Sequence, residues 1–348
     1  MRKLYCQVGF FFLISLIIIS LTGCNLFLQI MEGINKDGGE ESEDTKKLNP
    51  LPDSTEDGAI VIDSGFSDSN ALVHYGMSYS NYFGEHLYLS SLYHKSITRI
   101  DLSTNSVSEG FPLILSEVND LHGLAIDPDY GNIWLCDLNN HYLRHYDYNV
   151  DNIDNIYLGD TSQPVNVIAL YDGYVYVADR ANNSIWKVNI YEPQGSQVPY
   201  TDISDFSSSG YSDYIDMDFY EGLLCIVSQS LSGIVLVNTS DLSYYDTLSL
   251  SLSGTPIPHL GAVGICVSEY DGSIYLNAND HIYITDGFSG NIRSDWPIIK
   301  PDGYYGDYVE IELVNNTIYI ASWEGEGSDI GAHILAYPAP PKPTSPPS

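Results

Sequence analysis

Apolar residues recur in short runs separated by turn residues, from about residue 59 to residue 337. Six of these runs follow a Gly or Asn closely: 87–90, 133–136, 175–178, 224–227, 274–277 and 318–321. Their second positions lie 46, 42, 49, 50 and 44 residues apart. This period is typical of propeller blades, and no helical periodicity appears after the first 24 residues.

The repeat around residue 130 predicts four strands. Residues 121–127 form one apolar strand, residues 128–131 a tight turn, and residues 132–136 the second strand. The third and fourth strands are expected at 142–146 and 154–158. We therefore predict an all-β fold, a six-bladed propeller of four-stranded antiparallel blades that bury both faces against their neighbours.

The last repeat is one strand short. It supplies strands near 308–313, 317–321 and 332–337 before a Pro-rich stretch begins. The apolar run 59–63 lies upstream of the first repeat and has no partner there. We predict that this N-terminal strand pairs with residues 332–337 and closes the last blade.

The N-terminus predicts export and a lipid anchor. Arg2 and Lys3 precede the apolar run 10–19, which ends at Leu21-Thr22-Gly23-Cys24, as in a signal peptide. Those four residues resemble the lipobox of bacterial lipoproteins, which implies removal of residues 1–23 and acylation of Cys24. The alternative is an uncleaved signal anchor. The expected location is a membrane, either the outer membrane, its periplasmic face or the cell surface, with the lipid bilayer as a partner.

The composition of the chain after residue 23 indicates three parts: a linker, the propeller and a C-terminal tail. Residues 24–58 contain the lipidated cysteine and a linker rich in Gly, Ser, Asp, Glu and Lys, which predicts a flexible acidic tether. Residues 59–337 form the propeller. Residues 338–348 form a Pro-rich tail, because proline cannot donate to a strand ladder.

Charge narrows the possible partners. The chain has 46 acidic and 13 basic residues, a formal charge of −33, and loses two bases with residues 1–23. Such a chain is not expected to bind nucleic acid, whose affinity comes largely from clustered Lys and Arg. A divalent cation or a cationic partner is electrostatically favoured.

Besides Cys24, three cysteines remain after the predicted cleavage, Cys136, Cys225 and Cys266. Each lies in an apolar run that predicts a strand, and none forms a C-x-x-C pair. We expect buried thiols rather than a disulfide framework.

Two segments resemble NHL-type repeats. Residues 121–134 read LHGLAIDPDYGNIW, and residues 174–185 read YVYVADRANNSI. Similar repeats occur in YncE-like surface proteins and in the gluconolactonase group. The resemblance implies the propeller architecture but is weak evidence for an activity, because propellers host unrelated functions.

Function is expected on the face formed by the loops that enter each innermost strand and the loops between second and third strands. One such loop, residues 322–329, is about six residues longer than its equivalents. Its Trp323 could stack on a sugar ring, and Glu324, Glu326 and Asp329 could accept hydrogen bonds or bind a cation. The alternative is a surface loop without a partner. The other residues projected to this face are His122, Asp137, Asp179, Arg180, Asn182, Asp213, Tyr214, His259 and Asp307.

These acidic and amide side chains suggest a Ca²⁺ site, although Asp and Asn are also ordinary turn residues. The gluconolactonase resemblance implies a metal held by a Glu early in the first blade and by Asn and Asp later. Only Glu85 lies near the first turn, and it is not convincingly placed. No hydrolase, zinc-protease or phosphate-loop motif is present.

We therefore expect a monomeric, non-catalytic binding module for a protein, peptide or glycan, with no required cofactor. The alternatives are a Ca²⁺-dependent hydrolase or lactonase and a structural spacer of the cell envelope.

Overall fold

The structure is a computed structural model, and it describes part of the chain. The described residues are 60–63, 74–92, 94–169, 172–182, 184–191, 198–202, 215–228, 231, 233–257, 260–278, 281–298, 307–323 and 333–339. Contacts divide the chain into units Met1–Leu48 and Asn49–Ser348, and every described residue belongs to the second unit. The predicted signal peptide, Cys24, the linker and most of the Pro-rich tail lie outside the described residues.

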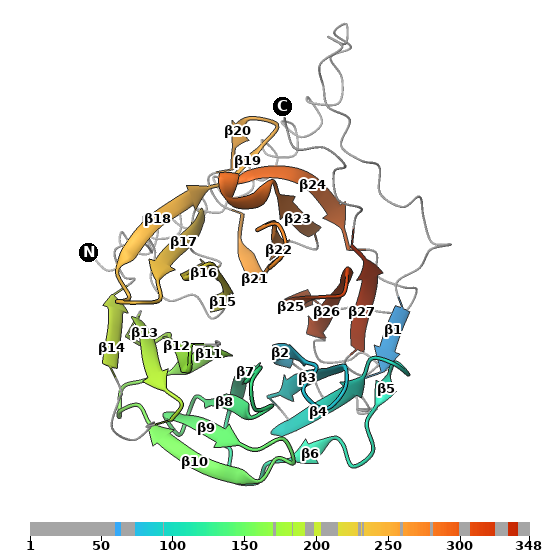
Figure 1. Cartoon of the computed structure of the whole chain (residues 1–348), viewed down its shortest axis with the longest axis vertical. Coiled ribbons are helices and arrows are strands. Elements are labelled where there is room, and N and C mark those ends of the chain that lie inside the picture. Colours follow the sequence, from blue (N-terminus) through green and yellow to red (C-terminus); the bar gives the residue numbers. More distant parts are fainter. Residues whose placement is uncertain are drawn as a thin grey trace, which may run out of the picture. The chain divides into compact units, whose positions relative to one another are not determined.

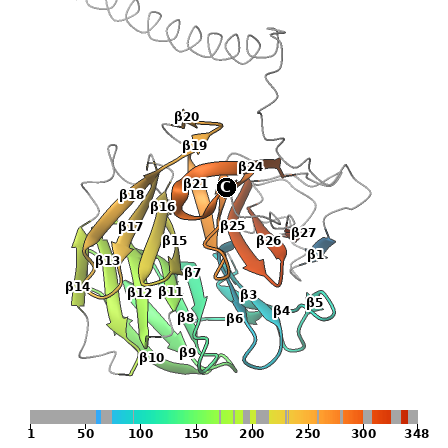
Figure 2. The same ribbon diagram turned by 45° about the horizontal axis from the view of Figure 1, so that its top comes forward.

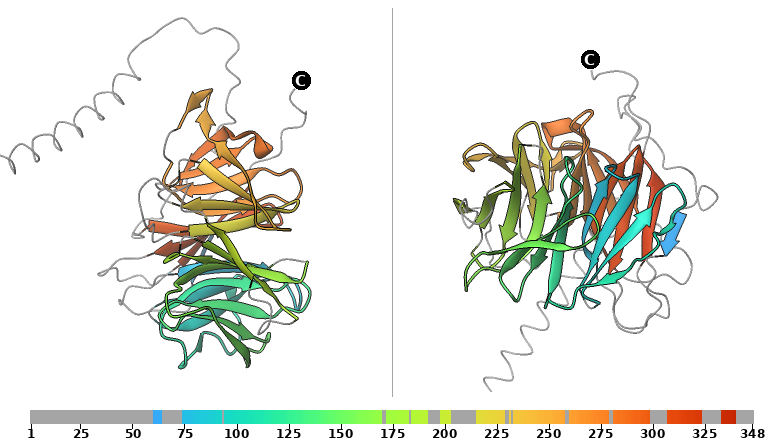
Figure 3. Two further views of the ribbon diagram at one scale, coloured as in Figure 1. Left: turned by 90° about the vertical axis from the view of Figure 1, so that its left-hand side faces the viewer. Right: turned by 60° about the horizontal axis from the view of Figure 1, so that its bottom comes forward.

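Six sheets surround a central axis, which confirms the predicted all-β six-bladed propeller (Figure 1). One strand of each sheet lies next to the axis (Figure 1), and Figure 3 shows the sheets from two other directions. The inner strands are β2 (His74–Ser80), β7 (Leu121–Ile126), β11 (Pro164–Ala169), β15 (Ile215–Tyr220), β21 (Ala262–Val267) and β25 (Asp307–Val314).

Three further strands continue each sheet outward. The second strands are β3 (His86–Ser91), β8 (Ile133–Asp137), β12 (Tyr174–Asp179), β16 (Leu223–Ser228), β22 (Ile274–Ala278) and β26 (Thr317–Trp323). The third are β4 (Ser96–Asp101), β9 (Tyr142–Tyr146), β13 (Ser184–Asn189), β17 (Gly233–Asn238), β23 (His281–Thr285) and β27 (His333–Pro338). The outermost are β5 (Ser106–Val107), β10 (Asn152–Tyr157), β14 (Val198–Asp202), β18 (Tyr244–Ser249), β24 (Asn291–Pro297) and β1 (Ile60–Asp63).

Few elements fall outside this pattern. Strand β6 (Leu113–Ile114) pairs with β4. Strands β19 (Ser251–Leu252) and β20 (Thr255–Pro256) form a hairpin that extends the fifth sheet at its outer edge (Figure 2). A single turn of 3₁₀-helix, Gly287–Ser289, is the helical element of the described residues. In the same part of the chain, no helix combines the length and the apolar character needed to cross a membrane.

The repeat found in the sequence occupies the second strand of every sheet, and its second position is buried. Trp134 and Tyr176 are completely enclosed. Apolar clusters form between neighbouring sheets: Leu87 of the first sheet, for example, packs with Ala321 and Ile334 of the sixth. Because each sheet is covered on both faces, the repeat reads as a short continuous apolar run instead of an alternating pattern.

The sixth sheet has the order β1-β27-β26-β25, with Ile60 opposite Ala336 and Asp63 opposite His333. This register is the one that closure of the sixth sheet by an N-terminal strand requires. That β1 closes the ring in this way is a proposal. Strand β26 is longer than predicted, because its ladder with β25 continues until Trp323 lies opposite Asp307. Trp323 therefore belongs to a strand. The predicted loop 322–329 was placed two residues too early, because its first two residues lie in β26.

Two glycines let three inner strands approach one another closely. A Cβ atom on Gly76 of β2 would lie 2.3 Å from the backbone nitrogen of Leu124, and one on Gly123 of β7 would lie 2.5 Å from Cα of Asn166. Distances this short exclude any side chain at either position. The inner strands β2, β7 and β11 are therefore in backbone contact beside the axis.

Candidate functional site

A cavity of about 990 Å³ lies at the centre of the inner strands. It is lined by the second halves of these strands and by the turns that lead to the second strands, from Gly76 on β2 to Val314 on β25. Asn81, Tyr270 and Asn315 line it within those turns and are exposed, so the cavity reaches solvent at that face. The loop face predicted from the sequence is at the opposite end, where the inner strands begin.

Five carboxyl groups line this central cavity. Asp216 and Asp218 come from β15, Glu310 and Glu312 from β25, and Glu269 from the turn after β21. Residues two apart on a strand point to the same side, which explains why both pairs face the axis. No Lys, Arg or His lines the cavity among the described residues. The lining is therefore acidic without a balancing base.

Asp216 and Asp218 also join the fourth sheet to the fifth. One carboxylate oxygen of Asp216 accepts a hydrogen bond from the backbone nitrogen of Ile265 at 2.7 Å, and Asp218 accepts one from Val267 at 2.5 Å. These N–H groups lie on the edge of β21, which has no neighbouring strand on the axis side. The two aspartates thus satisfy donors that the sheet leaves open.

The cavity raises the pKa of these carboxyl groups. Burial raises the pKa of Asp216 and of Asp218 to about 7. For Glu310 the pKa lies well above its usual range because of burial, and the charges of Asp216 and Glu312 raise it further. Burial and the nearby Asp218 and Asp216 act the same way on the pKa of Glu312. Without a cation nearby, these groups hold protons near neutral pH.

Asn166 supplies an unsatisfied acceptor to the same cavity. Its side chain comes from β11 and is 5% exposed. The amide nitrogen donates to Asp216 at 2.9 Å, whereas the amide oxygen has no hydrogen-bond partner among the described residues. A buried polar oxygen without a partner costs free energy, so this position suits a donor supplied by a ligand.

Aromatic side chains accompany the acidic ones. Tyr79, Phe219 and Tyr270 line the cavity. Other aromatic residues are exposed in turns on the same face as Tyr270: Tyr82, Phe83, Tyr130, Tyr148 and Tyr191. No motif in the sequence marks a site here, although the 29 tyrosines of the chain are a signal for aromatic surfaces.

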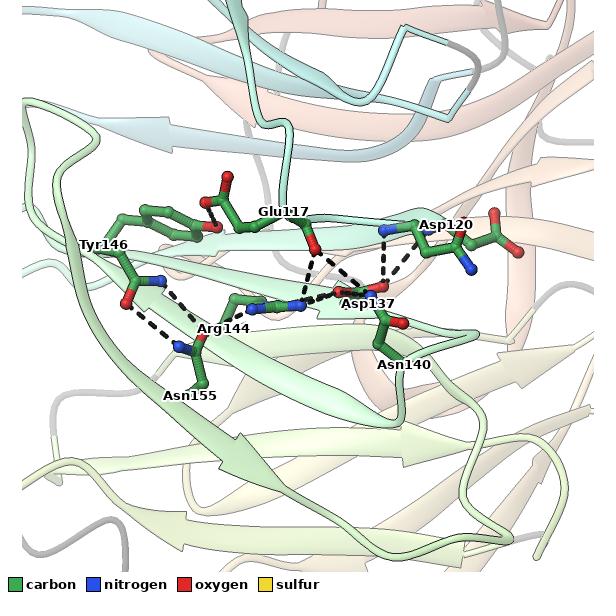
Figure 4. A network of polar contacts seen from close by, with 9 residues as sticks. Glu117, Asp120, Asp137, Asn140, Arg144, Tyr146 and Asn155 are labelled. Carbon is green, nitrogen blue, oxygen red and sulfur yellow. Dashed lines mark hydrogen bonds and ion pairs between the residues drawn. The ribbon is translucent and has the colours of Figure 1, made fainter.

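Asp137, at the predicted loop face, lies in a buried network (Figure 4). Its carboxylate accepts hydrogen bonds from Nε and Nη2 of Arg144 at 2.9 and 2.5 Å, from Asn140, and from the backbone nitrogens of Asn119 and Asp120. These five donors use most of the acceptor capacity of a carboxylate. Asp137 therefore holds the loop before β7 and the turn after β8 in place.

Asp179 occupies the equivalent place in the next sheet. It accepts hydrogen bonds from Gln163 and Ala181, from the backbone and side chain of Asn182, and from Nε1 of Trp186. Arg180 donates to the side-chain oxygen of Gln163. Asp179 and Asn182 thus stabilise this turn by their hydrogen bonds.

The remaining predicted residues of the loop face are not assembled into a site by the described structure. His122 is 7% exposed, and its Nε2 lies 3.6 Å from Asp120. Asp307 and Trp323 are opposite each other in the β25–β26 ladder. The others lie outside the described residues: Asp213, Tyr214, His259, Glu324, Glu326 and Asp329. A binding role for this face stays a prediction.

Glu85 lies in the turn between β2 and β3 and accepts a hydrogen bond from Asn315 at 2.7 Å. The inner strand of the first sheet contributes no carboxyl group to the cavity. In the described part of the chain, no group of three or more His, Cys, Asp or Glu residues is arranged to hold a metal ion.

No family model matches the sequence, and no curated protein sequence matches it. The fold is similar to that of a gluconolactonase from Xanthomonas campestris, with a TM-score of 0.58, 13% identity and coverage of 81% of this chain and 90% of that chain. A virginiamycin B lyase from Staphylococcus aureus gives a TM-score of 0.52 and 16% identity over 82% of this chain and 89% of that chain. A chain of a nidogen/laminin complex gives 0.52 and 12% over 65% and 81%.

Identities this low show a shared fold alone. The solved structures with a similar fold include enzymes and a chain of a binding complex, so the likeness selects neither class. The resemblance to NHL and YncE-like repeats stays a prediction.

Proposed function

We propose that this chain is an exported, lipid-anchored propeller that binds a ligand without covalent chemistry, at the cell envelope. This proposal rests on the central cavity. It has the size of a small-molecule site and combines aromatic rings, carboxyl groups and the unpaired oxygen of Asn166. A protein or glycan on the opposite loop face, with Trp323 in contact, belongs to the same proposal as a second surface.

Ligand-induced stabilisation tests this function. The full chain, purified in detergent, is screened by thermal shift against glycans, peptides and small amines. Asn81→Trp places a large side chain at the cavity mouth, and Asn149→Trp changes an exposed turn residue that does not line the cavity. We expect stabilisation by at least one ligand, lost in Asn81→Trp and kept in Asn149→Trp. Equal stabilisation in both variants would move the site away from the cavity.

The anchor and the closing strand have their own tests. Cys24→Ser should leave an unlipidated precursor, so unchanged mass and membrane partitioning would refute acylation of Cys24.

Removal of residues 60–63 takes away the partner of β27 and should lower the melting temperature. A melting temperature equal to that of the full chain would refute closure by the N-terminal strand.

A metal-dependent hydrolase is the second candidate, because the unpaired Asn166 oxygen lies beside Asp216 as a possible oxygen donor. The described residues fit a resident metal poorly. The Asp216 oxygens already accept from Ile265, Asn166 and Met217, which leaves about one lone pair. Metal analysis of the purified chain, with thermal shift in Ca²⁺ and in EDTA, tests this candidate. Stoichiometric metal with lactone hydrolysis would replace the binding proposal.

A further inference from the structure

The central cavity offers a ligand a group of hydrogen-bond acceptors near its axis. Asn166 presents its oxygen, since its nitrogen is already bonded to Asp216. The carboxyl groups of Glu310, Glu312 and Glu269 add further oxygens when ionised. A ligand that donates hydrogen bonds and carries positive charge is therefore complementary to these groups.

The carboxyl groups lie at two depths. Asp216 and Asp218 are two residues apart on β15, as are Glu310 and Glu312 on β25, so each pair is separated by roughly 7 Å along its strand. Asn166 bonds to Asp216 at the deeper level, and the charge of Glu269 acts on Glu312 at the level nearer the mouth. One small ion cannot contact both levels, whereas an extended molecule with two separated charges can.

Aromatic rings suit the same kind of ligand. Tyr79, Phe219 and Tyr270 line the part of the cavity nearer the mouth, where the faces of their rings can contact methylene groups and an ammonium ion. The net charge of −33 also favours the approach of a cation from solution.

We propose that the central cavity binds a linear polyamine, with one ammonium group between Glu310 and the Asn166 oxygen and a second beside Glu312 and Glu269. This inference rests on the proposed binding function and names its ligand class. Asp216 and Asp218 contribute negative potential, while their hydrogen bonds to β21 hold the cavity wall in position.

Binding should depend on pH. The raised pKa values of Asp216, Asp218, Glu310 and Glu312 mean that an arriving ammonium group displaces protons. The other titratable groups facing the cavity are Glu269, Cys266, Tyr79 and Tyr270, while β7 and β11 contribute none. Affinity should therefore rise as the pH increases through about 7.

Calorimetry on the full chain in detergent tests the polyamine directly. Spermidine and cadaverine are the probes, and the diol analogue of cadaverine is the neutral control. Glu310→Gln and Glu312→Gln keep the side-chain shape and remove one charge each. Glu109→Gln makes the same change at an exposed position away from the cavity. We expect each cavity variant to weaken polyamine binding about tenfold or more, with Glu109→Gln unchanged and the diol inactive.

Other results would overturn the inference in distinguishable ways. Binding of the diol as tightly as the diamine would remove the role of charge. Tighter binding of Ca²⁺, or of a lysine-containing peptide, would assign the cavity to that ligand. If no amine binds but a glycan or peptide still stabilises the chain, the polyamine is wrong while the binding function stands. If nothing binds and lactone hydrolysis appears, both proposals fail.

Discussion

Two regions of this propeller bury carboxyl groups, and they do so in opposite ways. In the second sheet, Asp137 is completely buried but faces the guanidinium of Arg144 and three further donors. In the central cavity, Asp216, Asp218, Glu310 and Glu312 face one another with no base among the described lining residues.

The difference separates structural acids from candidate binding acids. Burying a charge is costly unless the protein supplies an opposite charge or enough hydrogen bonds, and Arg144 supplies both for Asp137. The cavity acids have no opposite charge beside them among the described lining residues, so they take up protons, as their raised pKa values indicate. A cationic ligand would supply what Arg144 supplies in the second sheet.

The largest effect is expected from breaking the compensated region. Asp137→Ala leaves the buried Arg144 without its ion pair and should lower the free energy of unfolding by about 3 to 5 kcal/mol. Glu312→Gln, in the cavity, should leave the free energy unchanged or increase it, because it removes one of several repelling acids. Denaturant unfolding measures both. An equal decrease in the free energy of unfolding in the two variants would contradict the distinction between the two regions.

The pH dependence of stability should follow the cavity. Because burial raises the pKa of Asp216 and Asp218 to about 7 in the folded chain, the folded state holds more protons than the unfolded state above pH 4. The stability that these two groups contribute is therefore fully present below about pH 4 and is lost as the pH rises through about 7, by roughly 4 kcal/mol for each group. Denaturant unfolding across this range gives the slope.

The double variant Glu310→Gln/Glu312→Gln serves as the comparison for that slope. It removes two acids that repel Asp216 and Asp218 and should flatten the decline. An identical slope in the double variant would place the origin of the pH dependence outside the cavity.

A smaller loss is expected from Gly123→Ala. Its new Cβ would collide with Cα of Asn166 and push β7 away from β11, at a cost of about 1 to 3 kcal/mol. Gly110→Ala has open space around its Cβ and serves as a steric control, although its positive φ carries a modest penalty. Thermal unfolding compares the two. A Gly123→Ala variant no less stable than the control would contradict the close packing of the inner strands.

The smallest effect concerns two buried thiols. Cys136 lies between sheets, and Cys266 lines the cavity, where burial and the charge of Glu312 raise its pKa. Neither should react with iodoacetamide in the folded chain. Glu312→Gln should speed modification of Cys266 slightly and leave Cys136 unchanged, as followed by mass spectrometry of each peptide. Faster modification of Cys136 would indicate general loosening instead.

The sequence predicted the architecture well because each blade repeats the same apolar second strand. Strand β9 lies at the predicted residues 142–146, and the repeat positions Trp134 and Tyr176 are buried as a propeller requires. The length of β26 was missed because its last pair, Asp307 and Trp323, carries no apolar signal on the β25 side.

The cavity was missed for a different reason. Asp216, Asp218, Glu310 and Glu312 alternate with apolar residues on strands far apart in the sequence, a pattern that also describes an ordinary half-exposed strand. Only the closing of six sheets around one axis brings the four acids together. The predicted face, in contrast, was chosen from loops, where Asp137 and Asp179 hold turns in place by hydrogen bonds and a binding role stays a prediction.

Proton release on ligand binding tests the central cavity most directly. Cadaverine is titrated into the full chain near pH 7 in buffers of different ionisation enthalpy, and the slope of the observed heat gives the number of protons released. The raised pKa values of Asp216 and Asp218 predict release of about one proton or more per ligand, reduced or abolished in Glu310→Gln/Glu312→Gln. Binding of the diamine with no proton release would contradict an uncompensated acidic cavity.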